Sequence, residues 1–266
     1  MRGLLVLWDI DFTLIDARGV GARLYRMVFR DMFGAELPAA ADMAGRTDRA
    51  IVLDTLARAG IPEPRQHLDQ FLARLAALAP TGRELAERHS RALPGAAAAL
   101  DALAAFAPGR DGAPFRDGAR LRDGAPGRDG TDGAGDPAQQ VCVVQSVLTG
   151  NVRPMAEMKL SALGLDGHLD LEAGAYGESH EVRAELVHLA RENAARRYGT
   201  DFSGPATVLV GDTPLDVAAA LETGARAVAV ATGGTTAADL AESGAHAVLP
   251  DLTDTPAVLA AILAAP

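Results

Sequence analysis

The sequence contains a single cysteine, Cys142, and a single lysine, Lys159, among its 266 residues. One cysteine cannot form an internal disulfide, and its apolar neighbours predict a small buried core residue. No apolar run approaches the ~20 residues needed to cross a bilayer. The segment Leu4–Trp8 is too short for a signal peptide, because acidic residues follow it at once. These absences favour a cytoplasmic protein with no membrane partner.

Positive charge is also scarce. The chain has 25 Lys and Arg against 35 Asp and Glu, a formal net charge of -10. A broad basic surface for nucleic acid is therefore not expected, and a phosphate would need a metal ion or a local nest of backbone N–H groups. We expect no nucleic-acid partner, and a monomer or weak homodimer.

Length and patterning predict an α/β fold. Continuous apolar runs are typical of strands buried on both faces of a parallel sheet. The candidate strands are Leu4–Trp8, Val141–Leu148, Thr207–Val210 and Ala227–Val230, with weaker ones at Leu169–Leu171 and Ala247–Leu249. The helical stretches between them are Arg153–Leu163, Glu181–Arg197, Pro214–Thr223 and Thr236–Ser243. This alternation predicts a Rossmann-like, doubly wound parallel sheet.

A second domain is expected after the first strand. From about Gly19 to Arg91 the pattern is helical throughout, with a break at Pro62 and Pro64. We predict a helical cap domain, residues 17–92, inserted into an α/β core of residues 1–16 and 93–266. A helix over Ala96–Phe106 then returns the chain to the core.

Residues 107–138 form a segment of a different kind. Arg-Asp-Gly recurs there with few apolar residues, so the segment cannot build a core. We predict a flexible surface insertion, with a partner-binding or regulatory segment as the alternative. Its glycines do not indicate a phosphate loop, because no strand leads into them.

Polar residues follow the predicted strands at the edge where ligands of open α/β sheets gather. Asp9 and Asp11 come after the first strand, and Asp212 and Asp216 come after the Thr207–Val210 strand. Carboxylates placed so closely repel one another unless a cation compensates, and a hard divalent cation takes oxygen ligands. A magnesium site is therefore expected here.

The Val141–Leu148 strand leads into Thr149-Gly150-Asn151. This tripeptide offers a hydroxyl and backbone N–H groups just before a predicted helix, which favours anion binding.

These motifs together resemble those of the haloacid dehalogenase superfamily. Asp9-x-Asp11-x-Thr13-Leu14 looks like its motif I, Thr149 like motif II, and Gly211-Asp212-x-x-x-Asp216 like motif IV. The predicted helical insert resembles the C1-type cap of the group that includes phosphoglycolate phosphatases. Within it, Gly45-Arg46-Thr47-Asp48 resembles a loop that faces the substrate, and Leu93-Pro94-Gly95 resembles the return to the core.

The resemblance implies a role for each matching residue. Asp9 would be the nucleophile that becomes an aspartyl-phosphate, and Asp11 the general acid and base. Thr149, with Gly150 and Asn151, would hold the phosphoryl oxygens. Magnesium would be held by Asp9, the Asp11 carbonyl and Asp212, with Asp216 supporting bound water or the cationic residue. Arg46 would contact the substrate, although a salt bridge within the cap is an equal alternative.

Motif III departs from the family pattern, which places a lysine at a helix start before motif IV. The matching helix start here carries Arg183, and we expect it to be the cation beside the phosphoryl group. Lys159 is the rival, but its spacing is that of an ordinary exposed helix lysine.

The resemblance therefore implies a magnesium-dependent phosphatase of small phosphomonoesters, with a small phosphorylated metabolite as its partner. A haloacid dehalogenase needs no acid at the Asp11 position, and a phosphonatase needs a cap lysine that is missing here. A phosphomutase of the same superfamily remains an alternative. A non-catalytic binding protein on this fold is a further one, against which the complete acidic set argues.

Overall fold

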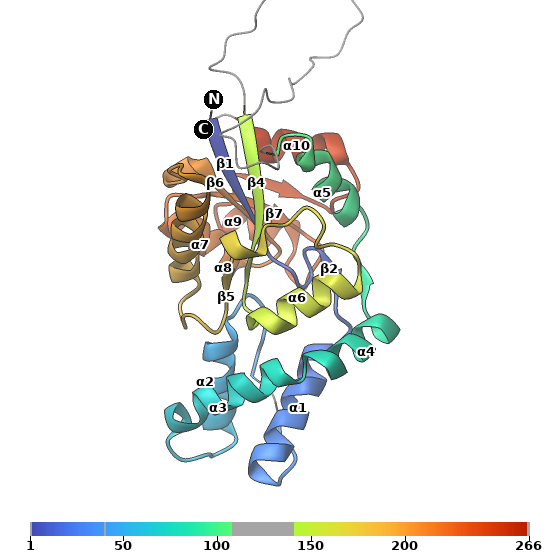
Figure 1. The fold of residues 1–266 in the computed structure, drawn as a ribbon, viewed down its shortest axis with the longest axis vertical. Helices are drawn as coiled ribbons and strands as arrows, with labels where there is room; N and C mark the ends of the chain where they lie inside the picture. Colours follow the sequence, from blue (N-terminus) through green and yellow to red (C-terminus); the bar gives the residue numbers. More distant parts are fainter. Residues whose placement is uncertain (1, 40, 108–140, 265–266) are drawn as a thin grey trace, which may run out of the picture.

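A parallel sheet forms the centre of the molecule (Figure 1). The computed structural model describes residues 2–39, 41–107 and 141–264. Neighbouring strands of the sheet run parallel in the order β5-β4-β1-β6-β7-β8. They are β1 (Arg2–Trp8), β4 (Val141–Thr149), β5 (Ala175–Tyr176), β6 (Thr207–Gly211), β7 (Arg226–Val230) and β8 (Ala247–Leu249). The predicted Rossmann-like α/β fold is confirmed. The prediction for residues 107–138 falls, apart from Ala107, outside the described residues.

Helices cover both faces of this sheet, and alternate residues of β1 supply both cores. Leu4, Val6 and Trp8 belong to the cluster under α5 (Ala96–Ala104) and α10 (Thr255–Leu263). Leu5 and Leu7 belong to the cluster under α7 (Arg183–Tyr198), α8 (Pro214–Glu222) and α9 (Ala237–Glu242). Because both faces are buried, β1 is apolar at every position from Leu4 to Trp8 rather than alternating.

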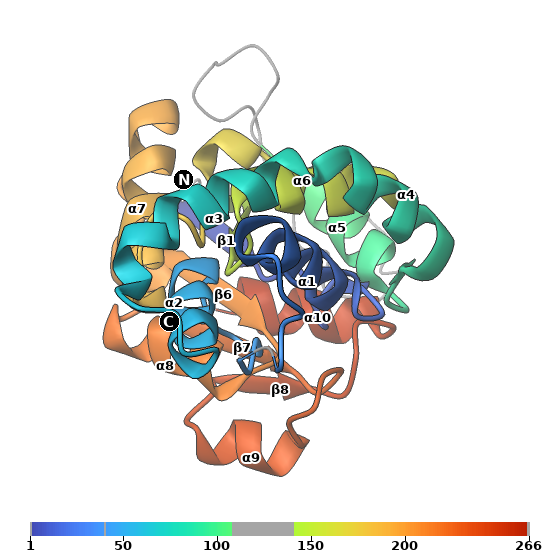
Figure 2. The ribbon, with the colours of Figure 1, turned by 90° about the horizontal axis from the view of Figure 1, so that it is seen from below.

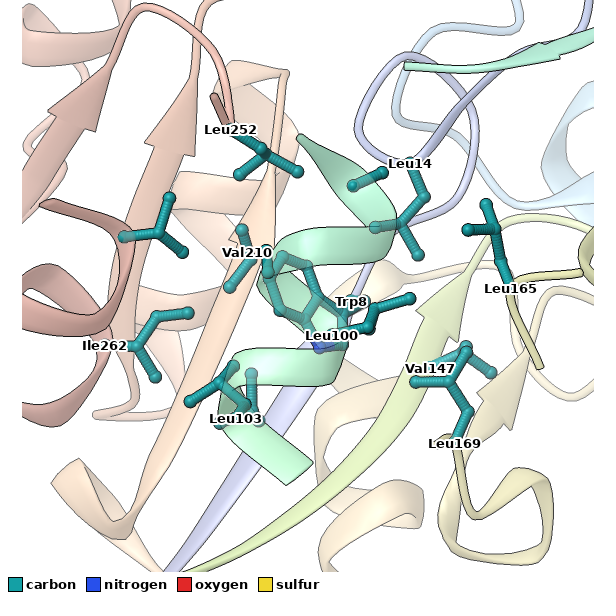
Figure 3. Packing of buried hydrophobic residues seen from close by; sticks show 14 of the residues in the cluster. Trp8, Leu14, Leu100, Leu103, Val147, Leu165, Leu169, Val210, Leu252 and Ile262 are labelled. Carbon is teal, nitrogen blue, oxygen red and sulfur yellow. The ribbon is translucent and has the colours of Figure 1, made fainter. Parts of the chain in front are cut away.

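Trp8 lies at the centre of the first of these cores (Figure 3). Its ring is fully buried among side chains that include Leu100, Leu103 and Val210. Its indole N–H donates to the amide oxygen of Gln145 at 3.2 Å, so the one polar atom of the ring is satisfied.

A second group of helices lies beyond the edge where β1, β4 and β6 end (Figures 1 and 2). It comprises α1 (Val20–Phe33), α2 (Asp48–Arg58), α3 (Pro64–Ala77) and α4 (Ala79–His89). These helices bury their own apolar cluster, to which Met155 and Met158 of α6 (Arg153–Ala162) contribute. The strands β2 (Ile15–Asp16) and β3 (Arg91–Ala92) pair in a two-stranded antiparallel sheet. β2 lies where the chain enters this group of helices, and β3 lies where it leaves. The cap boundaries at 17 and 92 stay a prediction.

Two local expectations are wrong. Leu169–Leu171 is not a strand: the Asp170 side chain caps a 3-10 turn, η2 (Leu171–Ala173), and the edge strand β5 follows it. The segment from Gly19 to Arg91 is not helical throughout, because residues 34–39 and 41–47 are not helical. Gly34 ends α1 with a φ of 66°, a left-handed conformation that suits glycine. A second 3-10 turn, η3 (Gly204–Ala206), precedes β6.

Within the described part of the chain, no helix combines the length and apolar character that a membrane crossing requires.

Gly95 lies where the chain returns to the core, in close contact with the backbone of Leu252. Its φ is +82°, and a Cβ there would lie 2.0 Å from the backbone oxygen of Leu252. Gly95→Ala should therefore lower the free energy of unfolding by at least about 2 kcal/mol, measured by denaturant titration. The control is Gly167→Ala, which meets no atom within 4 Å. It should shift stability by no more than about 0.5 kcal/mol, and equal effects of the two variants would contradict this packing.

Candidate active site at the ends of the central strands

Three neighbouring strands bring the predicted motifs together. Asp9 follows β1, Thr149 ends β4 and Asp212 follows β6, and the order β4-β1-β6 makes these positions adjacent. All three side chains are buried. The Asp9 N–H donates to the Val210 carbonyl at 2.8 Å, which fixes the backbone of the predicted nucleophile just past the sheet.

Arg183, the first residue of α7, lies beside Asp9 as expected. Its Nη2 is 3.0 Å from Asp9 Oδ1 and 2.6 Å from Asp216 Oδ1. Burial alone would lower the pKa of Arg183, but Asp216 and Asp9 outweigh it and raise that pKa. The Nε of Arg183 is buried and has no hydrogen-bond partner among the described residues. Arg183 is thus a buried cation between two carboxylates, and its Nη1 and Nη2 also donate to the Gly45 and Leu148 carbonyls at 3.2 and 3.4 Å.

The single positive charge of Arg183 cannot compensate all of the carboxylates around it. Oxygen atoms of Asp9, Asp212 and Asp216 all lie within 4.8 Å of one another. Burial, which outweighs the attraction of Arg183, raises the pKa of Asp9 to about 7. Burial, together with the charges of Asp9 and Asp216, raises the pKa of Asp212 to about 8. A divalent cation with oxygen ligands would relieve this repulsion, so the cluster could bind one.

Asp216 has several partners already. Its Oδ2 accepts hydrogen bonds from the Thr213 hydroxyl at 2.6 Å and the Thr213 N–H at 3.1 Å, a reciprocal cap at the start of α8. Its Oδ1 faces Arg183. Of the two roles expected for Asp216, supporting the cationic residue is the one that these contacts favour.

Lys159 is where the sequence interpretation is wrong. It is 4% exposed and turns inward from α6 rather than toward solvent. Its Nζ donates to both Asp11 oxygens, at 2.8 and 2.7 Å, and to Asn151 Oδ1 at 2.8 Å. The α6 spacing alone could not reveal this, because the partners come from two other segments. Arg183 therefore lies against Asp9, and Lys159 against Asp11.

The Thr149-Gly150-Asn151 turn links these groups. Asn151 Nδ2 donates to Asp11 Oδ2 at 2.8 Å and to Thr149 Oγ1 at 2.7 Å. A Cβ on Gly150 would lie 1.9 Å from the Arg46 carbonyl, and the Gly150 carbonyl accepts from the Asp48 N–H at 2.7 Å. The loop before α2 therefore lies directly on this turn.

Arg46 lines the cavity but is engaged within its own segment. Its Nη1 is 2.9 Å from Asp54 Oδ2, and its Nη2 donates to the Ala50 carbonyl at 3.3 Å. The salt-bridge alternative is what the structure describes, and a direct substrate contact stays a prediction.

Sequence reasoning missed the structural role of Asp48. Its Oδ1 accepts from the Tyr25 hydroxyl at 2.6 Å and its Oδ2 from the Val152 N–H at 2.7 Å, so it joins α1 and α2 to the start of α6. Burial raises its pKa to about 6. The loop resemblance pointed to this stretch, but no sequence signal marked Asp48 as buried.

Gly233 was missed as well. A Cβ on this residue would lie 1.9 Å from Asp212 Oδ2. Only glycine leaves room for the Asp212 carboxylate in this position.

These residues surround a cavity of about 330 Å³. The polar side chains that line it include Asp9, Asp11, Thr149, Asn151, Lys159, Arg183 and Asp212. The opposite wall comes from α1, α2 and the loop between them. A cavity of this size suits a small molecule.

Part of the chain matches a known protein family. Residues 185–255, which include Asp212 and Asp216, match a family model described as HAD-hydrolase-like. Among curated protein sequences, none matches the chain.

Solved structures share the fold over nearly the whole chain. A predicted phosphatase from Clostridium acetobutylicum is 13% identical, with a TM-score of 0.61, over 97% of this chain and 99% of its own. A hydrolase from Pseudomonas syringae is 19% identical, with a TM-score of 0.57, over 97% and 98%. A predicted phosphoglycolate phosphatase from Haemophilus somnus is 16% identical, with a TM-score of 0.55, over 97% of each chain. With the family match, they confirm the predicted resemblance to the haloacid dehalogenase superfamily.

The crowded carboxylates predict a pH-dependent stability. In the folded chain Asp212 keeps its proton up to a pKa of about 8, whereas the unfolded value is 3.8. The folded state therefore loses stability as the pH rises through that window. Asp212→Asn should remove this loss in chelator-treated protein. The Tm difference, variant minus wild type, should grow from pH 4 to pH 8 in thermal unfolding.

Asp251→Asn is the control for that series. Hydrogen bonds from Thr253 lower the pKa of this exposed carboxyl, so its contribution is lost only at lower pH. Its Tm difference should stay constant over the same window. A constant difference for Asp212→Asn would contradict the burial of an uncompensated charge.

Proposed function

We propose that this haloacid dehalogenase-like hydrolase is a magnesium-dependent phosphatase that cleaves a small phosphomonoester through an aspartyl-phosphate on Asp9. The observation that carries the proposal is the position of Asp9. It lies on the cavity wall beside Arg183 and the other carboxylates, with Asp11 two residues further along the same turn. A nucleophile, a cation for the phosphoryl oxygens and a second acid thus share one small cavity.

In the first step a carboxylate oxygen of Asp9 attacks phosphorus. The new bond joins Asp9 to phosphorus, and the bond from phosphorus to the alcohol oxygen breaks. The electron pair of the broken bond stays on the alcohol oxygen, which takes a proton from Asp11. The products of this step are the free alcohol and a phosphoryl group on Asp9.

In the second step water regenerates the enzyme. Asp11, now a carboxylate, accepts a proton from a water molecule as that water attacks phosphorus. The bond from phosphorus to Asp9 breaks, and inorganic phosphate leaves. Asp11 regains its proton and Asp9 its carboxylate, so protons and electrons balance over the cycle.

Fixed donors hold the phosphoryl oxygens in both steps. Arg183 offers its unpartnered Nε, and Thr149 offers its hydroxyl hydrogen because its oxygen already accepts from Asn151. Asp9 and Asp212 would hold the magnesium ion, with the Asp11 carbonyl as a further ligand. When bound, the ion offsets the repulsion between the carboxylates and the anionic phosphate.

The two alternatives differ from this proposal in what becomes of the phosphoryl group. A phosphomutase returns it to another position of a sugar phosphate, and a binding protein does not move it. Release of inorganic phosphate without an added second substrate separates the phosphatase from both.

The nucleophile supplies the direct test. Asp9→Asn keeps the side-chain size but removes the attacking oxygen anion. Phosphate release from benzyl phosphate with Mg²⁺ should fall by at least roughly a thousandfold, the scale of losing a covalent nucleophile. The variant should unfold at or above the wild-type temperature in chelator, because burial disfavours the charge that it removes.

Asp166→Asn, at an exposed position outside the cavity, is the matched control and should keep full activity. Turnover by Asp9→Asn within tenfold of the wild type would refute the assignment of the nucleophile.

A further inference from the structure

The charged residues around the cavity restrict the choice of substrate more than the volume of the cavity does. Four cationic residues line it, and each already has a carboxylate within ion-pair distance. Arg18 pairs with Asp16 at 2.7 Å, Arg46 with Asp54 at 2.9 Å, Lys159 with Asp11 at 2.7 Å and Arg183 with Asp9 at 3.0 Å. If Arg183 serves the phosphoryl group, no unpaired cation on the described cavity wall remains for a second anionic group.

The rest of the wall is largely apolar. Leu24, Tyr25, Met43, Ile51, Leu75 and Met155 line the side formed by the helices beyond the sheet. The buried Asp48 carboxylate lies in the same wall, and its hydrogen bonds come from Tyr25 and Val152 rather than from a cation. A second anion would therefore meet apolar surface and a carboxylate, both of which disfavour it.

We infer that the substrate is a phosphomonoester of an uncharged alcohol with an apolar face, such as an aromatic or aliphatic ring. This inference rests on the proposed phosphatase function and specifies its leaving group. Small dianionic acids that carry both phosphate and carboxylate, such as phosphoglycolate, are poor substrates on this account. Apolar contact with the wall supplies the binding energy for the leaving group.

Three phosphate esters test this inference through kcat/KM. Benzyl phosphate has a neutral apolar alcohol, glycerol 3-phosphate a neutral polar one, and phosphoglycolate a second anion. The wild type should favour benzyl phosphate over glycerol 3-phosphate by about tenfold or more, the scale of a few buried methylenes. Phosphoglycolate should be the poorest of the three.

Met43→Gln makes the wall polar with little change of size. The ratio of kcat/KM for benzyl phosphate to that for glycerol 3-phosphate should fall about tenfold. Met32→Gln is the matched control, because Met32 is also partly buried against the same apolar cluster but does not line the cavity. It should leave the ratio unchanged.

The possible outcomes separate this inference from the proposed function. A preference for phosphoglycolate, or equal ratios in the two glutamine variants, would overturn the inference and leave the phosphatase standing. Release of phosphate from none of the three esters would overturn the proposed function, and the inference with it.

A second inference concerns Lys159, and the contacts of its ammonium group carry it independently. An ammonium group has three N–H donors. In this chain they are used by the two Asp11 oxygens and by Asn151 Oδ1. Lys159 thus has no donor left for a phosphoryl oxygen, whereas the Arg183 Nε has no partner among the described residues.

Asp11 is correspondingly held in place. Lys159 donates to both of its oxygens, and Asn151 Nδ2 adds a third hydrogen bond at 2.8 Å. A carboxylate at a cavity wall would otherwise be free to rotate. We propose that Lys159 is a positioning residue, which holds the Asp11 carboxyl where the leaving oxygen collects its proton.

The dependence of kcat/KM on the leaving group distinguishes a lysine that positions Asp11 from a lysine that contacts the phosphate. Benzyl alcoholate is a poor leaving group that needs a proton, whereas 4-nitrophenolate leaves readily without one. Lys159→Met should lower kcat/KM at least about a hundredfold for benzyl phosphate but less than about tenfold for 4-nitrophenyl phosphate. The quantity kcat/KM reports the step in which the alcohol departs.

Asp11→Asn should show the same selectivity, and the double variant should be no slower than Asp11→Asn alone. Arg153→Met, which removes another α6 cation whose partners Glu157 and Glu172 lie outside the cavity, is the control and should keep wild-type kinetics. Equal losses for both esters, a slower double variant, or wild-type kinetics of Lys159→Met would each overturn the proposal. The wild type's own phosphate release tests the proposed function separately.

Discussion

The repulsion among buried carboxylates at the ends of β1 and β6 is the constraint on which the site depends. Asp9, Asp212 and Asp216 converge because adjacent parallel strands end at one edge. Arg183 stands between two of them, and its charge partly offsets their desolvation. The remaining excess of negative charge appears in the raised pKa values of Asp9 and Asp212. Such an excess is a cost to the folded chain, and a bound divalent cation would relieve it.

The same crowding of negative charge accounts for a separate cation beside each of Asp9 and Asp11. Arg183 lies against Asp9, at the start of α7, and Lys159 lies against Asp11, within α6. Each ion pair lies within the wall of one cavity, yet the two donor sets differ, since only Arg183 has a buried N–H without a partner. The chemistry proposed for each acid follows from this division: Asp9 attacks, and Asp11 exchanges a proton with the leaving oxygen.

Close backbone contacts hold the helical wall against this edge. The Asp48 N–H donates to the Gly150 carbonyl, and the Arg49 N–H donates to the Gly177 carbonyl at 3.2 Å. A Cβ on Gly177 would lie 1.7 Å from the Gly150 oxygen, so glycine is required for this approach. The cavity is therefore closed on one side by the very turn that is expected to bind phosphate.

Much of this arrangement could be predicted from the sequence because it is local. Apolar runs followed by Asp9, Thr149 and Asp212 determine both the strands and what lies at their ends. The partners of Lys159 and Asp48 could not be predicted, because they depend on how α6 and α2 pack against distant segments. The non-helical stretches at residues 34–39 and 41–47 were also missed, although Gly34 ends the helix before them.

Mass spectrometry of the reacting enzyme can detect whether a phosphoryl group passes through Asp9. Wild-type protein would be mixed with excess benzyl phosphate and Mg²⁺ and then quenched in acid within milliseconds. A fraction of the protein should then carry the mass of one phosphoryl group, located on the peptide that contains Asp9. Phosphate release in the same mixture with the group on another residue, or with no modified chain at any quench time, would contradict it.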